Sequence, residues 1–116
     1  MRPAILVAES EPQQALSVRK LVLETAKFNV LTAHSTAEAI ECIRQFPNFS
    51  AAVLVEEPMI ACEKVKREVE RRNPDAPVIV LSAREGYRCE GADYHLSSHD
   101  PDALVKLMRK LLGDPR

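Results

Sequence analysis

The chain has few of the residues that mark several classes of protein. Of its 116 residues only three are glycine, none is tryptophan and 4% are aromatic. Its three cysteines, Cys42, Cys62 and Cys89, are odd in number, far apart and without a Cys-x-x-Cys pair. The sequence therefore predicts neither a disulfide framework nor a zinc site, and we expect ordinary thiols in a reducing cytoplasm.

An excess of charge of one sign and a long apolar run are also missing. Sixteen basic residues stand against seventeen acidic ones, for a formal charge of −1, whereas domains that bind nucleic acid usually carry a clear basic excess. No apolar stretch approaches the roughly 20 residues that span a bilayer. None of the glycines stands directly after the first apolar run, which is where a nucleotide-binding loop would need them. We therefore expect a domain that binds neither nucleic acid nor membrane.

Short apolar runs alternate with amphipathic segments along the chain. With 46% hydrophobic residues the chain can bury the core of one domain, over residues 1–116. Helical patterns include a capping box at Ser35 and Glu38 and a last helix that Asp100 caps and Gly113 ends. Strands are predicted at 4–8, 29–33, 51–55, 78–81 and 94–97. Strands alternating with helices predict an α/β fold, a flavodoxin-like doubly wound sheet of five parallel strands in the order 2-1-3-4-5.

One connection is too short for this pattern. Only eight residues separate Ser82 from Gly91, whereas a crossover between parallel strands usually needs about a dozen or more, including a helix. We therefore predict that the fourth helix of the fold is short or absent.

The helical pattern at 63–72 carries a run of charges, EKVKREVERR. Opposite charges four residues apart, such as Glu68 and Arg72, stabilise an exposed helix. We favour a solvated helix face here over a docking surface.

Four stretches of the chain resemble receiver domains of two-component signalling. They are ILVAESEP at 5–12, NPDAPVIVLSA at 73–83, and GADY at 91–94 with DPDAL at 100–104. The resemblance implies a domain that takes a phosphoryl group from a histidine kinase onto an aspartate after the third strand. That aspartate and an acidic pair would hold Mg²⁺. The Mg²⁺, a hydroxyl and a lysine would together stabilise the transferring group.

The first half of this site departs from the family pattern. Glu9 and Ser10 fall on the acidic pair, so that one carboxylate is lengthened and the other lost, and Glu11 matches the neighbouring acid. Glu56 falls on the phosphoacceptor position, with Glu57 as the alternative if the alignment slips by one residue. The metal ligands left, Glu9 and Glu56, imply that the magnesium site is weak or lost.

The second half departs as well. Ser82 fits the hydroxyl position, but the lysine position falls on Ser98, or on Ser97 in the other register. The same two registers leave His95 or Tyr94 at the position of the family's switch aromatic. The first basic residue after Gly91 is Lys106, well inside the last helix.

These departures favour a pseudo-receiver, which regulates partners by protein contacts without normal aspartyl phosphorylation. We expect a signalling domain and not an enzyme. It should bind no cofactor, or bind Mg²⁺ only weakly. The expected partners are a sensor kinase, an output domain or another signalling protein, and a homodimer is left open. The alternative is a phosphorylation-competent receiver that uses Glu56 or Glu57 with Mg²⁺. Glu56 either imitates a phosphorylated aspartate or is a solvated acid at a strand end. We favour the solvated acid, because a carboxylate carries one negative charge whereas phosphate carries about two.

Overall fold

The computed structural model describes residues 3–10 and 18–114. Five strands and four helices follow one another in these residues. They are β1 (Ala4–Ala8), α1 (Val18–Thr25), β2 (Asn29–Ala33), α2 (Thr36–Gln45), β3 (Ala51–Val55), α3 (Cys62–Arg72), β4 (Val78–Ser82), β5 (Tyr94–Ser97) and α4 (Pro101–Leu112). Within the described residues, none of the helices has the length and apolar character needed to cross a bilayer.

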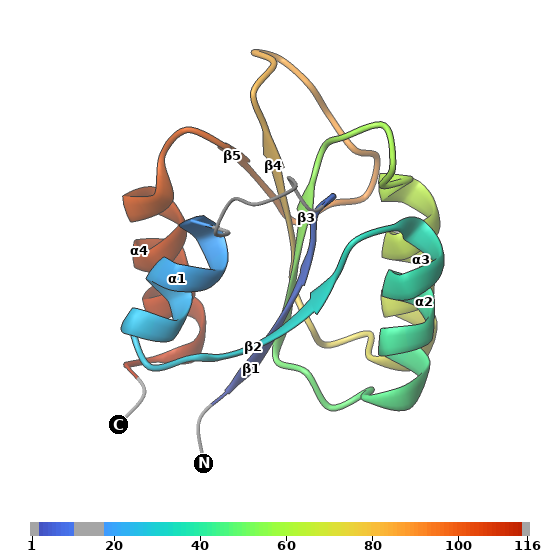
Figure 1. The fold of residues 1–116 in the computed structure, drawn as a ribbon, viewed down its shortest axis with the longest axis horizontal. Helices are drawn as coiled ribbons and strands as arrows, with labels where there is room; N and C mark the ends of the chain where they lie inside the picture. The colour runs from blue at the N-terminus through green and yellow to red at the C-terminus, as the bar shows by residue number, and fades with distance from the viewer. Residues whose placement is uncertain (1–2, 11–17, 115–116) are drawn as a thin grey trace.

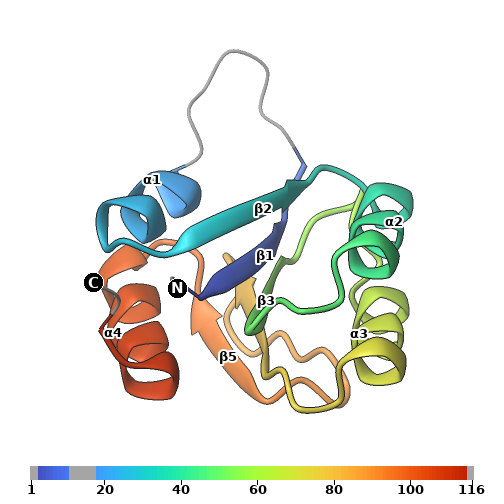
Figure 2. The same cartoon turned by 90° about the horizontal axis from the view of Figure 1, so that it is seen from below.

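The strands form one parallel sheet in the order β2-β1-β3-β4-β5, which confirms the predicted fold class. Helices α1 and α4 cover one face of the sheet and α2 and α3 cover the other (Figures 1 and 2). A sheet with helices on both faces buries its central strands completely. Every residue of β3 is accordingly buried, as its unbroken apolar sequence predicts.

One apolar core lies on each side of the sheet. Side chains along a strand point alternately to opposite faces. In β1, Ile5 packs into the core under α1 and α4, and Leu6 packs into the core under α2 and α3. Helix α4 adds Leu104 and Met108 to the first core.

The predicted helix ends are confirmed. Ser35 caps α2, since its Oγ accepts a hydrogen bond from the Glu38 backbone N–H at 3.1 Å. Asp100 caps α4, since its Oδ1 accepts one from the Ala103 N–H at 3.0 Å. Gly113, with φ of 81°, follows α4 in a conformation that favours glycine.

The connection between β4 and β5 contains no helix over residues 83–93, all of which are described. This β4–β5 loop projects beyond the end of β4 and returns alongside α3 (Figure 1). Gly86 and Gly91 both have positive φ, of 78° and 84°, where turns favour glycine. The prediction of a short or absent fourth helix is therefore confirmed, and the last helix of the fold is α4.

The loop is joined to the body of the protein by a disulfide bond between Cys62 and Cys89. The expectation of ordinary thiols was wrong for these two residues, and only Cys42 is free. The two cysteines are 27 residues apart and carry no pairing motif. They meet because the loop, lacking a helix, passes the first residue of α3.

Candidate functional site

The carboxyl ends of β1, β3 and β4 bring most of the predicted site residues to one edge of the sheet. Parallel strands place their ends at a common edge, where such folds usually carry their sites. Glu9 and Ser10 follow β1, Glu56 and Glu57 follow β3, and Ser82 ends β4. Glu11 lies outside the described residues.

Glu56 is held by two donors. Its Oε1 accepts hydrogen bonds from the Ser82 Oγ at 2.9 Å and from the Arg84 Nε at 2.8 Å. Its side chain is 20% exposed. The hydrogen bond from Arg84, together with that from Ser82, outweighs burial and lowers the pKa of Glu56. Glu56 is therefore not the solvated acid that the sequence favoured.

Arg84 is the residue of the site that the sequence analysis missed. The resemblance places the cation at the end of the fifth strand, whereas Arg84 follows the fourth. The Arg84 backbone N–H donates to the Ser82 Oγ at 2.9 Å, so that the chain turns directly after β4. The Arg84 guanidinium also lies 4.9 Å from the centre of the Tyr87 ring, within the range of a cation–π interaction. The short β4–β5 connection in the sequence was the signal that could have pointed to Arg84. Because no helix follows β4, the residues directly after Ser82 lie close to Glu56.

Glu57 points away from Glu56, towards the end of β1. Its Oε2 accepts hydrogen bonds from both the backbone N–H and the hydroxyl of Ser10. The two adjacent glutamates thus have different surroundings. Of the two, Glu56 is the one whose carboxylate meets the hydroxyl at the end of β4.

Glu9 is a buried carboxylate, with 3% of its surface exposed. Its Oε2 lies 3.3 Å from the Arg19 Nη1 of α1. Its backbone N–H donates to the Ala33 carbonyl of the neighbouring strand at 2.9 Å. A buried charge requires a partner of this kind, and Arg19 supplies it.

The described carboxylates do not fit a magnesium centre. Mg²⁺ needs oxygen ligands that are free to approach it and keeps several waters. Arg19 is paired with Glu9, Arg84 with Glu56, and Ser10 donates to Glu57. Over residues 3–10 and 18–114, no group of three or more acidic, histidine or cysteine side chains is placed to hold a metal ion. Both carboxylates at the candidate metal positions already have a guanidinium partner, whose positive charge opposes the approach of a second cation.

Both candidate positions for the lysine lie beside Ser82. Ser97 is its partner in the register of β4 and β5, and the Ser98 N–H donates to the Ser82 carbonyl at 3.0 Å. His95 faces the β4–β5 loop, since its Nε2 accepts from the Cys89 N–H at 3.0 Å. Tyr94 is 38% exposed, and its side chain points to the other face of the strand.

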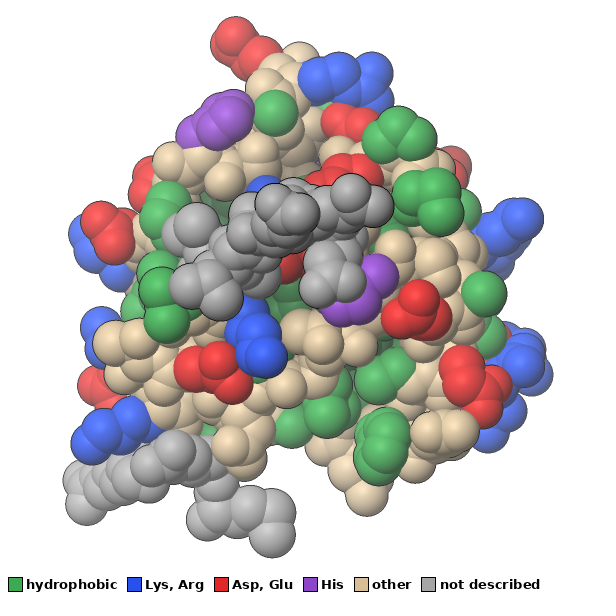
Figure 3. All heavy atoms as spheres, viewed as in Figure 1, with side chains coloured by type: hydrophobic (Ala, Val, Ile, Leu, Met, Phe, Trp, Pro, Cys, Tyr) green, Lys and Arg blue, Asp and Glu red, His purple; other side chains and the backbone are tan. Residues whose placement is uncertain are grey.

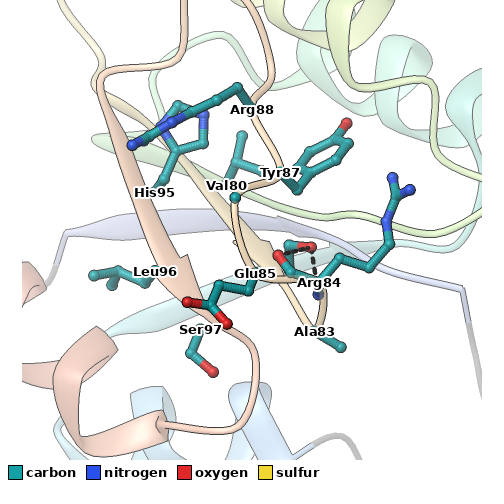
Figure 4. Close-up of a pocket in the computed structure, with 11 residues that line it drawn as sticks. Val80, Ala83, Arg84, Glu85, Tyr87, Arg88, His95, Leu96 and Ser97 are labelled. Carbon is teal, nitrogen blue, oxygen red and sulfur yellow. Dashed lines mark hydrogen bonds between the residues drawn. The ribbon is translucent and has the colours of Figure 1, made fainter.

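A cavity of about 340 Å³ lies between the β4–β5 loop and β5. We call it the β4–β5 hollow. Its lining includes Val80, Ser82, Arg84, Arg88, His95 and Ser97. In Figure 4, Arg88 extends towards His95, while Arg84 and Tyr87 extend to the other side. The hollow is present because no helix covers this part of the sheet.

The fold defines a class. A doubly wound sheet of five parallel strands in this order is the fold of response regulator receiver domains, and the described residues of this chain have it.

Three solved structures illustrate the likeness. The response regulator protein TrrA from Thermotoga maritima, in complex with Mg²⁺ and BeF, is 28% identical, with a TM-score of 0.74 over 95% of this chain and 99% of that one. A receiver domain protein from Clostridium thermocellum is 22% identical, with a TM-score of 0.77 over 95% of this chain and 94% of that one. A chain in the complex of the histidine kinase ThkA with TrrA is 28% identical, with a TM-score of 0.67 over 95% of this chain and 98% of that one.

No family model matches the sequence, and no curated protein matches it. The likeness is thus carried by the three-dimensional structure.

Proposed function

We propose that this chain is a receiver domain of two-component signalling that works as a pseudo-receiver, regulating partners by protein contacts without aspartyl phosphorylation. One observation carries the proposal: the carboxylate at the phosphoacceptor position, Glu56, is already bound by Ser82 and Arg84.

The internal pairing takes up groups that phosphoryl transfer needs. Transfer depends on groups positioned for the developing charge. At Glu56 the hydroxyl and the guanidinium that could serve the transferring group instead bind the carboxylate itself. The longer glutamate side chain also displaces the carboxylate, and misplacement on the scale of an ångström can cost about 100-fold in rate.

The same contacts support a constant state of the site. The resemblance implies that a phosphoryl group on the acceptor would bind the hydroxyl at the end of β4. Glu56 makes that contact without a phosphoryl group, and Arg84 adds a cation from the β4–β5 loop. We propose that this arrangement holds the loop in one position, which a partner then reads.

The proposed partners are proteins: a sensor kinase, an output domain or another signalling protein, with a homodimer left open. The solved complex of TrrA with the histidine kinase ThkA supports a protein partner. Acidic and basic side chains are mixed on the face in Figure 3, which supports a role without nucleic acid. A cytoplasmic setting is part of the proposal and rests on the likeness to receiver domains, because the Cys62–Cys89 bond removes the argument from unpaired thiols.

The test is incubation with acetyl phosphate and Mg²⁺, followed by intact-mass measurement. We expect no increment of about 80 Da, the mass of a phosphoryl group, and little thermal stabilisation by millimolar Mg²⁺. An adduct that Glu56→Gln abolishes would establish the phosphorylation-competent alternative at Glu56. Loss in Glu57→Gln instead would move the acceptor by one residue.

A restoration experiment tests the same proposal from the other side. Ser10→Asp, Glu56→Asp and Ser98→Lys, combined with Arg84→Ala, should regain labelling. The first three substitutions return the missing groups, and the fourth frees the carboxylate. The same variant with Arg84 retained is the matched control and should label less. Equal labelling of the two would show that Arg84 does not block the acceptor.

A further inference from the structure

The β4–β5 loop is held to α3 at its far end. Cys89 of the loop is 1% exposed and bonded to Cys62, the first residue of α3, which is 4% exposed. Two residues further on, the side chain of Lys66 from α3 lies across Gly91, in space that any side chain at position 91 would occupy. The start of α3 therefore fixes the returning limb of the loop.

The other anchors of the loop are weaker. Arg84 pairs with Glu56, but its side chain is 68% exposed, and exposed ion pairs contribute little. Tyr87 packs against the edge of the core under α2 and α3. The Cys89 N–H donates to His95. Only the disulfide is covalent, so it dominates the position of the loop.

We propose that Cys62 and Cys89 form a reversible redox site, and that its state sets the position of the β4–β5 loop. In the oxidised form the loop is bonded to α3, Arg84 remains paired with Glu56, and the loop lines one side of the β4–β5 hollow. In the reduced form the loop leaves α3 and the hollow opens. This inference takes the cytoplasmic setting from the proposed function, but it does not depend on whether Glu56 accepts a phosphoryl group.

The chemistry is thiol–disulfide exchange with a dithiol. A thiolate of the dithiol attacks one sulfur of the pair, and the S–S bond breaks to a mixed disulfide and one protein thiolate. The second thiol of the reductant then displaces the other protein sulfur. Two electrons and two protons reach Cys62 and Cys89, and the reductant leaves as its disulfide. Disulfides found in a reducing compartment are typically transient and redox-sensing.

Access to the buried bond comes from the loop itself. Residues 83–86 are all exposed. Two of the loop's backbone hydrogen bonds are internal to it, from Tyr87 to Arg84 and from Ala92 to Cys89. Segments of this kind open at low free-energy cost. We expect residues 83–88 to open while the bond is still intact, which uncovers Cys89 for a thiolate without unfolding of the sheet.

Cys42 serves as an internal reference. It lies on α2, is free, and is only half-buried. Burial raises the pKa of the Cys42 thiol, which lowers its thiolate fraction and its reactivity. It should therefore stay outside the exchange.

The first measurement counts thiols. Protein treated with oxidised glutathione, then denatured and alkylated, should label at Cys42 alone, and after dithiothreitol at all three cysteines. Label at Cys62 and Cys89 after the oxidising treatment would overturn the proposal.

The second measurement is limited trypsin digestion of the folded protein, read by mass after reduction and quenching. Dithiothreitol should accelerate cleavage after Arg84 and Arg88 at least about tenfold. The sites after Arg71 and Arg72 in α3 are the reference and should be cut only later. Cleavage in α3 that keeps pace with the loop would show that reduction unfolds the whole domain and would overturn a local switch. Loop cleavage unchanged by dithiothreitol would overturn it too.

Variants complete the test. Cys62→Ala with Cys89→Ala should be cut rapidly at the loop with and without dithiothreitol, whereas the matched control Cys42→Ala should respond as the natural chain does. If the double variant does not fold, reduction followed by re-oxidation of the Cys42→Ala protein replaces it: loop protection should be lost and then regained. Protection that does not return would overturn a reversible site.

Discussion

At the scale of residues, the central feature is one carboxylate shared by a hydroxyl and a guanidinium. Glu56, Ser82 and Arg84 come from two neighbouring strand ends, and their contacts are 2.9 Å and 2.8 Å long. Each of these donors favours the charged form of Glu56. The site is therefore a neutralised pair in place of a free acid.

Arg84→Ala should raise the pKa of Glu56 towards its ordinary value, because the hydrogen bond from Arg84 is the largest cause of its lowering. A carbon-detected NMR titration of the Glu56 carboxyl group measures the change. Arg88→Ala, which removes a guanidinium from the same loop, is the matched control and should leave the titration of Glu56 unchanged. An equal response to both variants would mean that the general charge of the loop, and not the contact, lowers the pKa.

The same lowering gives a pH dependence of stability. A carboxyl group with a depressed pKa in the folded state contributes stability above its unfolded value, about 4.3, and loses it as pH falls through the folded pKa. The free energy of unfolding of the natural chain should therefore exceed that of Glu56→Gln at pH 6, by at most about 1 kcal/mol. Urea titrations should show the difference vanish towards pH 2. Glu90→Gln, in the exposed loop, is the control for the change in charge.

At the scale of elements, α2 and α3 are joined by a buried glutamate. Glu68 is 6% exposed. Its carboxylate lies 3.4 Å from Arg44 of α2, and 3.4 Å and 3.3 Å from Arg71 and Arg72 of its own helix. Burial by itself would raise the pKa of Glu68, but the hydrogen bonds from Arg44 and Arg72 outweigh it and lower the pKa. The expectation of a solvated face is wrong at this residue.

Glu68→Gln should destabilise the protein by about 1–3 kcal/mol, because it removes hydrogen bonds in which both partners are charged. Glu70→Gln is the matched control on the same helix: Glu70 pairs with Lys66, but its side chain is 54% exposed, and the loss should be about 0.5 kcal/mol or less. Denaturant unfolding measures both. Equal losses would show that the contact between α2 and α3 contributes nothing beyond a surface pair.

At the scale of the whole molecule, a covalent bond joins the helix-free β4–β5 loop to α3. Cys62 and Cys89 close a loop with a sequence separation of 27 residues. In the chain-entropy account, a closed loop of that size stabilises the folded state by about 3–4 kcal/mol, since it restricts the unfolded chain. The domain therefore depends on its redox state for a large part of its stability.

Reduction with dithiothreitol should lower the melting temperature by roughly 10–20 °C. Differential scanning calorimetry with and without the reductant measures the shift. Cys62→Ala with Cys89→Ala should melt at the reduced value in both conditions, and Cys42→Ala should shift like the natural chain. A natural chain that melts at one temperature in both conditions would contradict a stabilising bond.

The sequence by itself determined the elements and their order. Unbroken apolar runs, the cap at Ser35 and the glycine after α4 are local patterns, and each acts within a few residues of the chain. The absence of the helix between β4 and β5 was also readable, because it depends only on the number of residues available between Ser82 and Gly91. Strand order followed from the alternation of strands and helices.

Only the tertiary structure decided the contacts of the site. The pairing of Arg84 with Glu56, that of Cys62 with Cys89, and the burial of Glu68 under Arg44 join residues 24 to 28 positions apart. No periodicity records such pairs, because their meeting depends on where a loop turns and how two helices pack. Glu56 after β3 can be recognised in the sequence. Its pairing with Arg84 cannot, because it depends on how the β4–β5 loop turns in the folded protein.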